Sequence, residues 1–530
     1  MPIGCCRAGN GTRGRLRIRG IVESWSPNPL KLRILAGLAV LVLAACGARQ
    51  QIKPAAHAAD ATTAPADQLA AAMSLIASQN WPDALVALRA IVESPSFRHM
   101  PDDFQYRALS TAGWTALRHG SPQLAHDYEV RVSALPQAGY EDWLSRLRAA
   151  AKVDDQADTI NALTVLMRRW PDRARQYDSD YILHIVHAAK RSTEETALLQ
   201  ALYDAQWKLP GDVEPSAAWR DLMLRLLEKG RVSEAGEVVS RVTDVYVLIA
   251  MRSDRRFDQI VEANAARFDI GAAADRELHE LQAATEKSPK FLRLKWQVIE
   301  ALGVRQRYEA SLAAADTILL DIRSTNYPEK LYDDFGDEES WFLGMRAMAL
   351  QRLGRLDEAL EQWTAASQLH EKYSGNVDQM IGLADFYCSL ERPRDALSTL
   401  MRMTTGTSPF GAMRVESVRL DAYVQLKDEK QISRLLGYLR SHRADDPSSY
   451  EQALLVANRQ GPAAAELVRR LLDKDLRQDA LLEAQDFAPT PGTPHDMELD
   501  ARGRALLTRP EVRAAIDKVG RVASYPLEAP

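Results

Sequence analysis

The sequence predicts an all-α fold in which helical hairpins stack into a solenoid, and two observations carry this prediction. Alanine and leucine dominate the 530 residues, aromatic residues make up only 7%, and alternating runs rich in Val, Ile and Tyr are scarce, which argues against a β-sandwich, barrel or propeller. Two stretches far apart in the chain also repeat one spacing of bulky, glycine and alanine residues, as solenoids do. With 46% hydrophobic residues, the chain can bury a core along most of its length.

The first 45 residues are expected to be an export leader and not part of the fold. Basic residues precede a run of twelve apolar residues, Ile34–Ala45, which is too short to span a bilayer comfortably and fits a secretory signal. The run ends in Leu43-Ala44-Ala45-Cys46, which resembles the bacterial lipobox. The resemblance implies that residues 1–45 are removed, that Cys46 carries fatty acyl chains such as palmitate, and that residues 46–67 form a flexible tether.

The location follows from the same leader. Residues 1–29 are long for the basic region of a signal and show no apolar periodicity, which indicates a mis-assigned translation start, with Leu30 as the better one. Gly47, and not aspartate, follows the cysteine. By the sorting rule of enteric bacteria this implies an outer-membrane lipoprotein that faces the periplasm of a Gram-negative envelope.

Cys388 is the one cysteine expected in the folded body, because Cys5 and Cys6 would leave with the leader and Cys46 would be acylated. The body can then form no internal disulfide. Cys388 falls in a helical pattern of apolar residues, so we expect a buried and unreactive thiol.

The clearest repeats lie at residues 219–242 and 343–366. The shared positions are Trp219, Leu222, Leu226, Gly230, Ala235, Val239 and Val242 in one, and Leu343, Ala347, Leu350, Gly354, Ala359, Trp363 and Ala366 in the other. Apolar residues three or four apart bury one face of a first helix, glycine adopts the left-handed turn conformation, and alanine lies where the second helix approaches most closely. The segments 228–235 and 352–359 resemble the most diagnostic stretch of the tetratricopeptide repeat, which implies a right-handed solenoid.

Weaker copies surround these two repeats, at spacings that depart from the family's 34-residue unit. Their expected close-approach alanines are Ala84, Ala125, Ala310 and Ala396, and a further copy ends at Trp170-Pro171. About eight to eleven units are expected in all. The predicted division is an N-terminal array at 68–250, an irregular helical segment at 251–290, a C-terminal array at 291–487, and a linker with a capping helix at 488–530, of which residues 523–530 are expected to fray.

An acidic, proline-containing stretch at 320–338 interrupts the second array. Loops of this length are uncommon unless they are functional or disordered. Two interpretations stay open, a solvated insertion and a contact loop.

We find no motif for catalysis, for a cofactor or for a metal ion. The pairs His279-Glu280 and His370-Glu371 begin the zinc-protease pattern, but positions 283 and 374 are Ala and Ser, and the chain has no Gly-Lys pair for a phosphate-binding loop. Residues 1–46 hold seven of the 67 Lys and Arg residues and one of the 72 acidic residues, which leaves a body with a net charge of −11. Such a body lacks the attraction that drives nonspecific nucleic-acid binding, so no nucleic-acid partner is expected.

The resemblance implies that partners bind in a concave groove lined by the first helix of each repeat. The side chains expected to face this groove are Arg220, Asp221, Leu224, Met345 and Met348, with Trp114 and Arg118 in an earlier copy. Trp114 and Arg118 match the composition of binding hot spots, although Trp114 can equally pack between hairpins.

The predicted function is therefore a non-enzymatic, membrane-anchored periplasmic scaffold that binds a protein or peptide partner, in a process such as envelope assembly. One alternative is a solenoid-type enzyme that acts on cell-wall glycan or polysaccharide, with a carboxylate site within 251–340. Another is a structural, oligomeric spacer. The sequence leaves the identity of the partner and the oligomeric state open.

Overall fold

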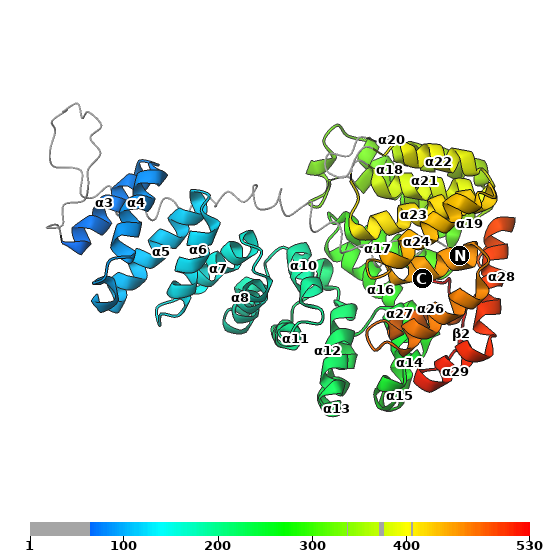
Figure 1. The fold of residues 1–530 in the computed structure, drawn as a ribbon, viewed down its shortest axis with the longest axis horizontal. Coiled ribbons are helices and arrows are strands. Elements are labelled where there is room, and N and C mark those ends of the chain that lie inside the picture. Colours follow the sequence, from blue (N-terminus) through cyan, green and yellow to red (C-terminus); the bar gives the residue numbers. More distant parts are fainter. Residues whose placement is uncertain (1–63, 337, 370–375, 404–405) are drawn as a thin grey trace. The chain divides into compact units, whose positions relative to one another are not determined.

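The computed structural model describes residues 64–336, 338–369, 376–403 and 406–530 (Figure 1). These residues form 27 α-helices, several short 3₁₀ turns and one two-stranded ladder, so the prediction of an all-α solenoid of helical hairpins is confirmed. They divide by internal contacts into two units, 64–207 and 208–530, which we call the N-terminal unit and the C-terminal unit. Cys46 and the predicted leader lie outside the described residues.

In the N-terminal unit each helix packs against the next from α3 to α8. The elements are α3 (Pro65–Ala77), α4 (Trp81–Val92), η1 (Phe97–His99), α5 (Asp102–Arg118), α6 (Pro122–Ser133), α7 (Tyr140–Lys152), α8 (Gln156–Arg169), α9 (Pro171–Ala174), α10 (Ser179–Ala189) and α11 (Glu195–Asp204).

The C-terminal unit begins with short elements and continues as a regular stack from α17 to α26. Its first elements are η2 (Pro210–Asp212), α12 (Ser216–Glu228), α13 (Val232–Val238), η3 (Val239–Arg241), α14 (Val245–Ser253), η4 (Arg255–Phe257), α15 (Asp258–Ala263), η5 (Ala265–Phe268) and α16 (Ile270–Lys287). The stack comprises α17 (Leu292–Val304), α18 (Tyr308–Arg323), η6 (Pro328–Lys330), α19 (Glu338–Arg352), α20 (Leu356–Gln368), α21 (Val377–Ser389), α22 (Pro393–Met401), α23 (Pro409–Gln425), α24 (Glu429–Ser441), α25 (Pro447–Val456) and α26 (Gln460–Leu472). The chain ends with α27 (Arg477–Glu483), β1 (Asp486–Phe487), α28 (Pro494–Leu507), α29 (Pro510–Val519) and β2 (Ser524–Tyr525).

One turn geometry joins the two helices of nine hairpins within the described residues. In each, the residue two before the second helix has a φ between 53° and 81°. The nine residues are Gln79, Gly120, Asp154, Gly230, Gln306, Gly354, Glu391, Lys427 and Asn458. In each, the next residue donates its N–H to the carbonyl five positions back, as Arg355 does to Leu350, which is the Schellman closure of a helix end. Glycine occupies only three of the nine positions, which explains why most repeats were faint in the sequence.

The fourth residue of each second helix is buried. At this position the side chain is at most 8% exposed in all nine hairpins: Ala84, Ala125, Thr159, Ala235, Ser311, Ala359, Ala396, Ile432 and Ala463. The prediction of Ala310 for this position was wrong by one residue, because α18 begins at Tyr308 and Ala310 is exposed. Ser311 takes its place and donates its hydroxyl to the carbonyl of Ile299 on the facing helix, at 3.1 Å.

The acidic stretch packs against its own unit. Its first residues still belong to α18, which runs to Arg323, and the connection from 324 onward reaches back to the start of α17. There Asp334 accepts the N–H groups of Leu292 and Arg293, at 2.7 Å and 3.0 Å, and so satisfies two donors at the helix N-terminus. Tyr332 is buried in the core between α17, α18 and α19.

The last residues of the chain are packed, so the expectation that 523–530 fray was wrong. β2 pairs in parallel with β1, and Tyr525 and Leu527 are only 5% and 3% exposed. The N–H of Glu528 donates to the carbonyl of Val304, at 2.8 Å. Sequence reasoning missed this because the residues that bury the segment lie far away along the chain.

We expect Gly354→Ala and Gly437→Ala to change stability in opposite directions. Neither glycine has an atom within 4 Å of an added Cβ, so only the backbone conformation differs. Gly354 has a φ of +73°, where alanine costs about 1–2 kcal/mol, whereas Gly437 lies inside α24, where alanine gains about 0.5–1 kcal/mol. Urea unfolding of the C-terminal unit measures both changes, and effects of the same sign would contradict the assigned turn.

Tyr525→Ala should cost about 3 kcal/mol of the free energy of unfolding of the C-terminal unit, because a large buried aromatic side chain is removed. The matched control is Tyr327→Ala, whose side chain is 56% exposed and which should change stability by less than about 0.5 kcal/mol. Chemical denaturation measures both. Equal effects would mean that the C-terminal residues are not packed as described.

Candidate functional site

The ends of the first helices of five successive hairpins meet a single segment of the chain, residues 489–502. Along this segment the contacts reach the repeats in sequence order, except at two neighbouring residues. There Asp496 contacts the earlier helix, α21, and His495 contacts the later helix, α23. The contacts are Gln306 Nε2 to the Pro489 carbonyl (3.1 Å), Arg352 Nη1 to the Pro491 carbonyl (3.4 Å), Ser389 Oγ to Asp496 Oδ1 (2.9 Å), His495 Nε2 to Asp421 Oδ2 (3.0 Å), and Arg502 Nη1 to the carbonyls of Leu455 (3.1 Å) and Val456 (2.7 Å). The ends of the first helices in this unit therefore carry part of the chain itself.

A cluster of titratable groups forms where α28 crosses α21 and α23. The hydrogen bond that His495 donates to Asp421 raises the pKa of His495, and the nearby carboxylates of Asp496 and Asp385 add to the effect. Desolvation raises the pKa of Asp385 to about 6, although Arg414 opposes the shift. The cluster thus combines three carboxyl groups with one imidazole and one guanidinium group.

This cluster does not have the arrangement of a nucleophile and its base. Ser389 donates its hydroxyl to the carboxylate of Asp496, whereas His495 bonds Asp421. A serine nucleophile needs a base in hydrogen-bond contact that removes its proton. The contacts instead link α28 to two neighbouring repeats.

A second stretch of the tail is held more deeply. Glu528 forms an ion pair with Arg352 at 2.8 Å, and both side chains are about seven-eighths buried, at 13% and 14% exposed. Burial raises the pKa of Glu528, and the hydrogen bond from Arg352 opposes that rise. The hydroxyl of Tyr246 donates to the Glu528 carbonyl at 2.7 Å, so this residue joins α14, α17 and α19.

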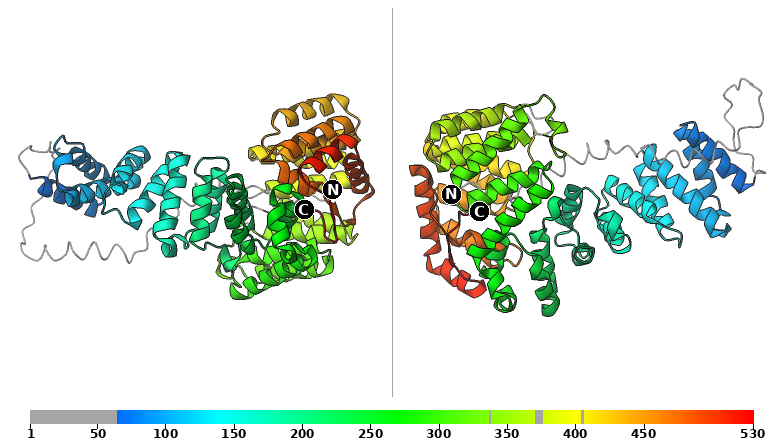
Figure 2. Two further views of the ribbon diagram at one scale, coloured as in Figure 1. Left: turned by 90° about the horizontal axis from the view of Figure 1, so that it is seen from below. Right: turned by 180° about the vertical axis from the view of Figure 1, so that it is seen from behind.

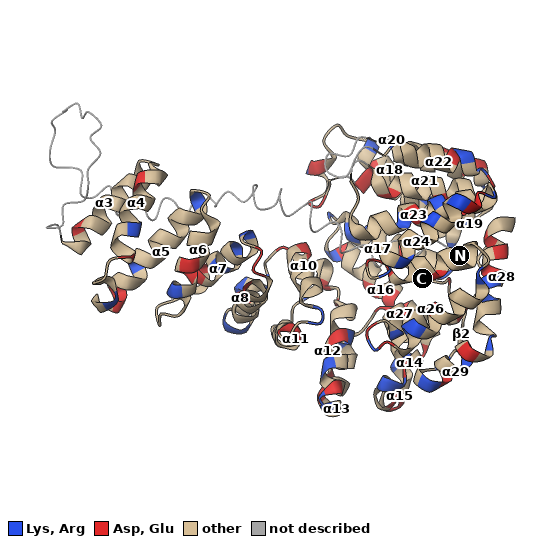
Figure 3. Ribbon diagram, in the orientation of Figure 1, with Lys and Arg blue, Asp and Glu red and all other residues tan. Residues whose placement is uncertain are grey.

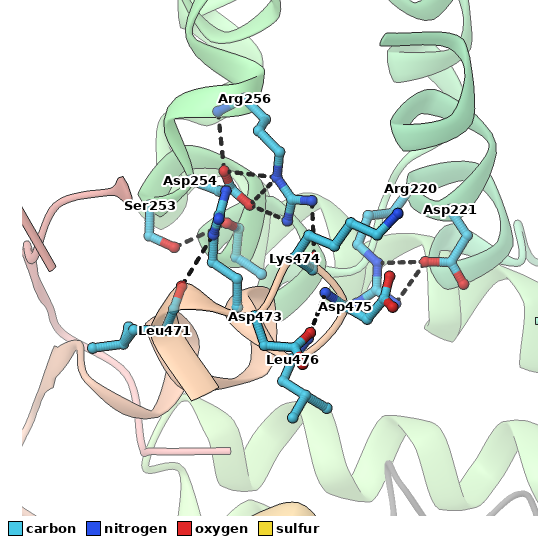
Figure 4. A network of polar contacts seen from close by, with 12 residues as sticks. Arg220, Asp221, Ser253, Asp254, Arg256, Leu471, Asp473, Lys474, Asp475 and Leu476 are labelled. Atoms are coloured by element: carbon cyan, nitrogen blue, oxygen red, sulfur yellow. Dashed lines mark hydrogen bonds and ion pairs between the residues drawn. The ribbon is translucent and has the colours of Figure 1, made fainter. Parts of the chain in front are cut away.

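The beginning and end of the C-terminal unit also meet each other. α14 packs against α27, and both views in Figure 2 show the red C-terminal segment against green helices of the same unit. At this contact Arg256 pairs with the fully buried Asp254 and donates to the Lys474 carbonyl at 2.9 Å (Figure 4). A Cβ on Gly520 would lie 2.3 Å from the Ser253 carbonyl oxygen, so only glycine fits there.

Two of the predicted groove residues lie beside this closing contact. Arg220 pairs with Asp221 at 2.8 Å, next to the loop that carries Asp475 (Figure 4). Asp221 and Leu224 are each only 8% exposed. Met345 is buried in the core, and Met348 is partly buried between two core clusters. The side chains of these five residues are mostly buried. Their role in partner binding stays a prediction.

In the N-terminal unit Trp114 lies at the junction of the first two hairpins. Its ring contacts Trp81 of α4 edge to face, with centroids 5.5 Å apart. The Arg118 guanidinium lies 5.3 Å from the centroid of Trp114 and is exposed. The packing role considered for Trp114 is therefore present, and its binding role stays a prediction.

A basic and aromatic surface at the end of α8 was missed. Four exposed arginines lie within eight residues, and Figure 3 shows blue ribbon at this end of α8. They are Arg168, Arg169, Arg173 and Arg175. Arg169 lies 4.4 Å from the centroid of Trp170, which in turn contacts Tyr140 edge to face at 6.0 Å. The signal was visible in the sequence, but this stretch was interpreted only as the end of a repeat.

Two further findings concern the described residues alone. Among them no group of three or more His, Cys, Asp or Glu side chains is placed to hold a metal ion, and none of their helices combines the length and apolar character needed to cross a membrane. The expectation for Cys388 is confirmed: its side chain is buried, and burial raises the pKa of the thiol well above its usual value.

No protein-family model matches the chain, and no curated protein matches it. Among solved structures, a similar one is the TPR domain of P58(IPK), at 14% identity over 74% of this chain and 98% of that chain, with a TM-score of 0.19. Yeast Tom70 is similar at 10% identity over 86% of this chain and 99% of that chain, with a TM-score of 0.30. The APC/C hetero-tetramer Cut9–Hcn1 is similar at 14% identity over 79% of this chain and 84% of that chain, with a TM-score of 0.28. At these scores the likenesses carry no argument, and the fold assignment rests on the helices and turns described above.

We expect His495→Ala to destabilise the C-terminal unit more at about pH 5.5 than at about pH 8.5. Because its pKa in the folded state is raised above the ordinary 6.5, the pair with Asp421 stabilises fully below that ordinary value. This stabilisation is lost as the pH rises through the raised pKa. The measurement is the difference in free energy of unfolding between wild type and variant across this range. His279→Ala, at an exposed position on α16, is the control, and a difference that grows with pH would contradict the assignment.

Proposed function

We propose that the protein is a membrane-anchored scaffold that binds a protein or peptide partner in the periplasm and acts by binding, without catalysing a reaction. The single observation that carries the proposal is the set of nine hairpins with a common turn, three in the N-terminal unit and six in the C-terminal unit, because stacked hairpins present extended surfaces for partners. The anchor is the acylated thiol of Cys46, which the lipobox resemblance supports. The location is the outer membrane facing the periplasm, and the process is envelope assembly.

The surface that engages the partner lies on the N-terminal unit. In the C-terminal unit the ends of the first helices already contact residues 489–502. The N-terminal unit instead exposes Arg168 and Arg169 beside the partly buried Trp170, and these residue types are enriched in binding hot spots. Trp114 and Arg118 belong to the same unit and add a second pair of this kind.

The proposal predicts that Arg169→Glu combined with Trp170→Ala releases a partner that wild type retains. The test is immunoprecipitation of the crosslinked full chain from membranes with an antibody against the protein itself. A tag is avoided at both ends: cleavage before Cys46 would remove an N-terminal tag, and a C-terminal tag would follow the buried Leu527. Loss of a hot spot should reduce recovery of the partner by about tenfold or more.

The matched control is Arg107→Glu, a charge reversal at an exposed position of α5 in the same unit, which should leave recovery unchanged. Cys46→Ala should abolish incorporation of labelled palmitate and move the protein out of the membrane fraction. No stoichiometric partner across several growth conditions, or equal loss with the control, would overturn the binding role. Membrane attachment that survives Cys46→Ala would overturn the anchor.

A further inference from the structure

The segment 488–507, which we call the strap, is anchored at both ends by apolar burial. Before it, β1 pairs with β2, and after it α29 buries Val512, Ile516 and Val519 in the core around α26. Between these anchors α28 has one large apolar side chain that is fully buried, Leu506 in its last turn. The middle of the strap therefore rests on the unit through polar contacts.

The surface beneath the strap combines carboxyl groups and carbonyl acceptors, with the guanidinium group of Arg414 near Asp385. Asp385 of α21 and Asp421 of α23 supply carboxyl groups, and the carbonyls of Leu455 and Val456 terminate α25. Helix C-terminal ends carry partial negative charge in addition. The ends of these three helices thus combine carboxylates, carbonyl acceptors and helix dipoles of one sign.

The strap supplies two donor side chains to this surface, and also an acidic contact, Asp496, which accepts from Ser389. His495 lies on Asp421 at 3.0 Å, and Arg502 donates to the Val456 carbonyl at 2.7 Å. These two side chains lie seven positions apart in α28, two helical turns, and so reach two neighbouring repeats from one face of the helix. The same positions on an incoming segment would have to carry cationic donors.

We propose that the C-terminal ends of α21, α23 and α25 form a binding surface for a basic segment of a protein partner, and that the strap occupies this surface until such a segment displaces it. The proposal rests on the scaffold function and adds the chemistry of a second binding surface. The strap can lift as a loop because the core around α29 and the β1–β2 pairing hold its two ends. Local opening of this kind is typical of segments with few buried apolar contacts.

Hydrogen exchange of the full chain tests whether the strap lifts by itself. In wild type the amides of α28 should exchange about tenfold or more faster than those of α29. The double variant His495→Ala, Arg502→Ala should speed exchange of α28 by about a further tenfold and leave α29 unchanged. Arg504→Ala is the matched control, because this α28 arginine is 60% exposed at its side chain and pairs only within its own helix.

Binding in trans tests the surface. The probe is a fluorescein-labelled peptide with the sequence of residues 488–507. It should bind the double variant about tenfold more tightly than wild type, because the competing strap is weakened, and the same peptide with His495→Glu and Arg502→Glu should not bind.

Two results would overturn the proposal. One is exchange of α28 and α29 at the same rate in wild type and double variant, which would make the strap part of the cooperative unit. The other is a double variant with a freely exchanging strap that does not bind the peptide. Neither measurement uses the cellular partner, so a failed immunoprecipitation leaves this result standing, and a failure here leaves the N-terminal surface standing.

Discussion

The close approach of two helices across a left-handed turn is the constraint on which the described structure depends. A residue with positive φ reverses the chain in three residues, and a small or tightly packed side chain four positions into the next helix lets the two axes come together. Both conditions hold in all nine hairpins, with Thr159, Ser311 and Ile432 in place of alanine in three of them. In the stack from α17 to α26, this common closure leaves the ends of the first helices where one segment, residues 489–502, contacts all five.

This common closure has a chemical consequence in the C-terminal unit. Five first helices end along one line, so their terminal carbonyls and last-turn side chains can be met by one segment of chain. Residues 489–502 meet them through hydrogen bonds and ion pairs, whereas Tyr525, Leu527 and Glu528 are buried. The tail therefore has a firmly packed end and a polar middle, and this contrast makes its middle the part of the unit best suited to exchange with a partner.

The two units thus offer different chemistry to partners. The N-terminal unit exposes arginines around Trp170, which favours acidic or aromatic contacts. The surface under the strap carries Asp385 and Asp421 and favours basic ones. Under the proposed function, two surfaces of different charge would engage partners of different chemistry.

The sequence by itself determined the class of fold, the two clearest hairpins and the burial of Cys388, because these depend on residues within about one repeat of each other. Period, turn glycine and close-approach alanine are local signals. It missed most turns, because residues other than glycine, such as Gln79 and Lys427, adopt the positive φ that glycine favours. It also placed the buried position of α18 at Ala310, one residue before Ser311. Only the tertiary structure decided where the tail lies. His495 and Asp421 are 74 residues apart in the sequence, and Arg352 and Glu528 are 176 residues apart. No local spacing in the sequence predicts such contacts, because they form only when the whole unit is folded.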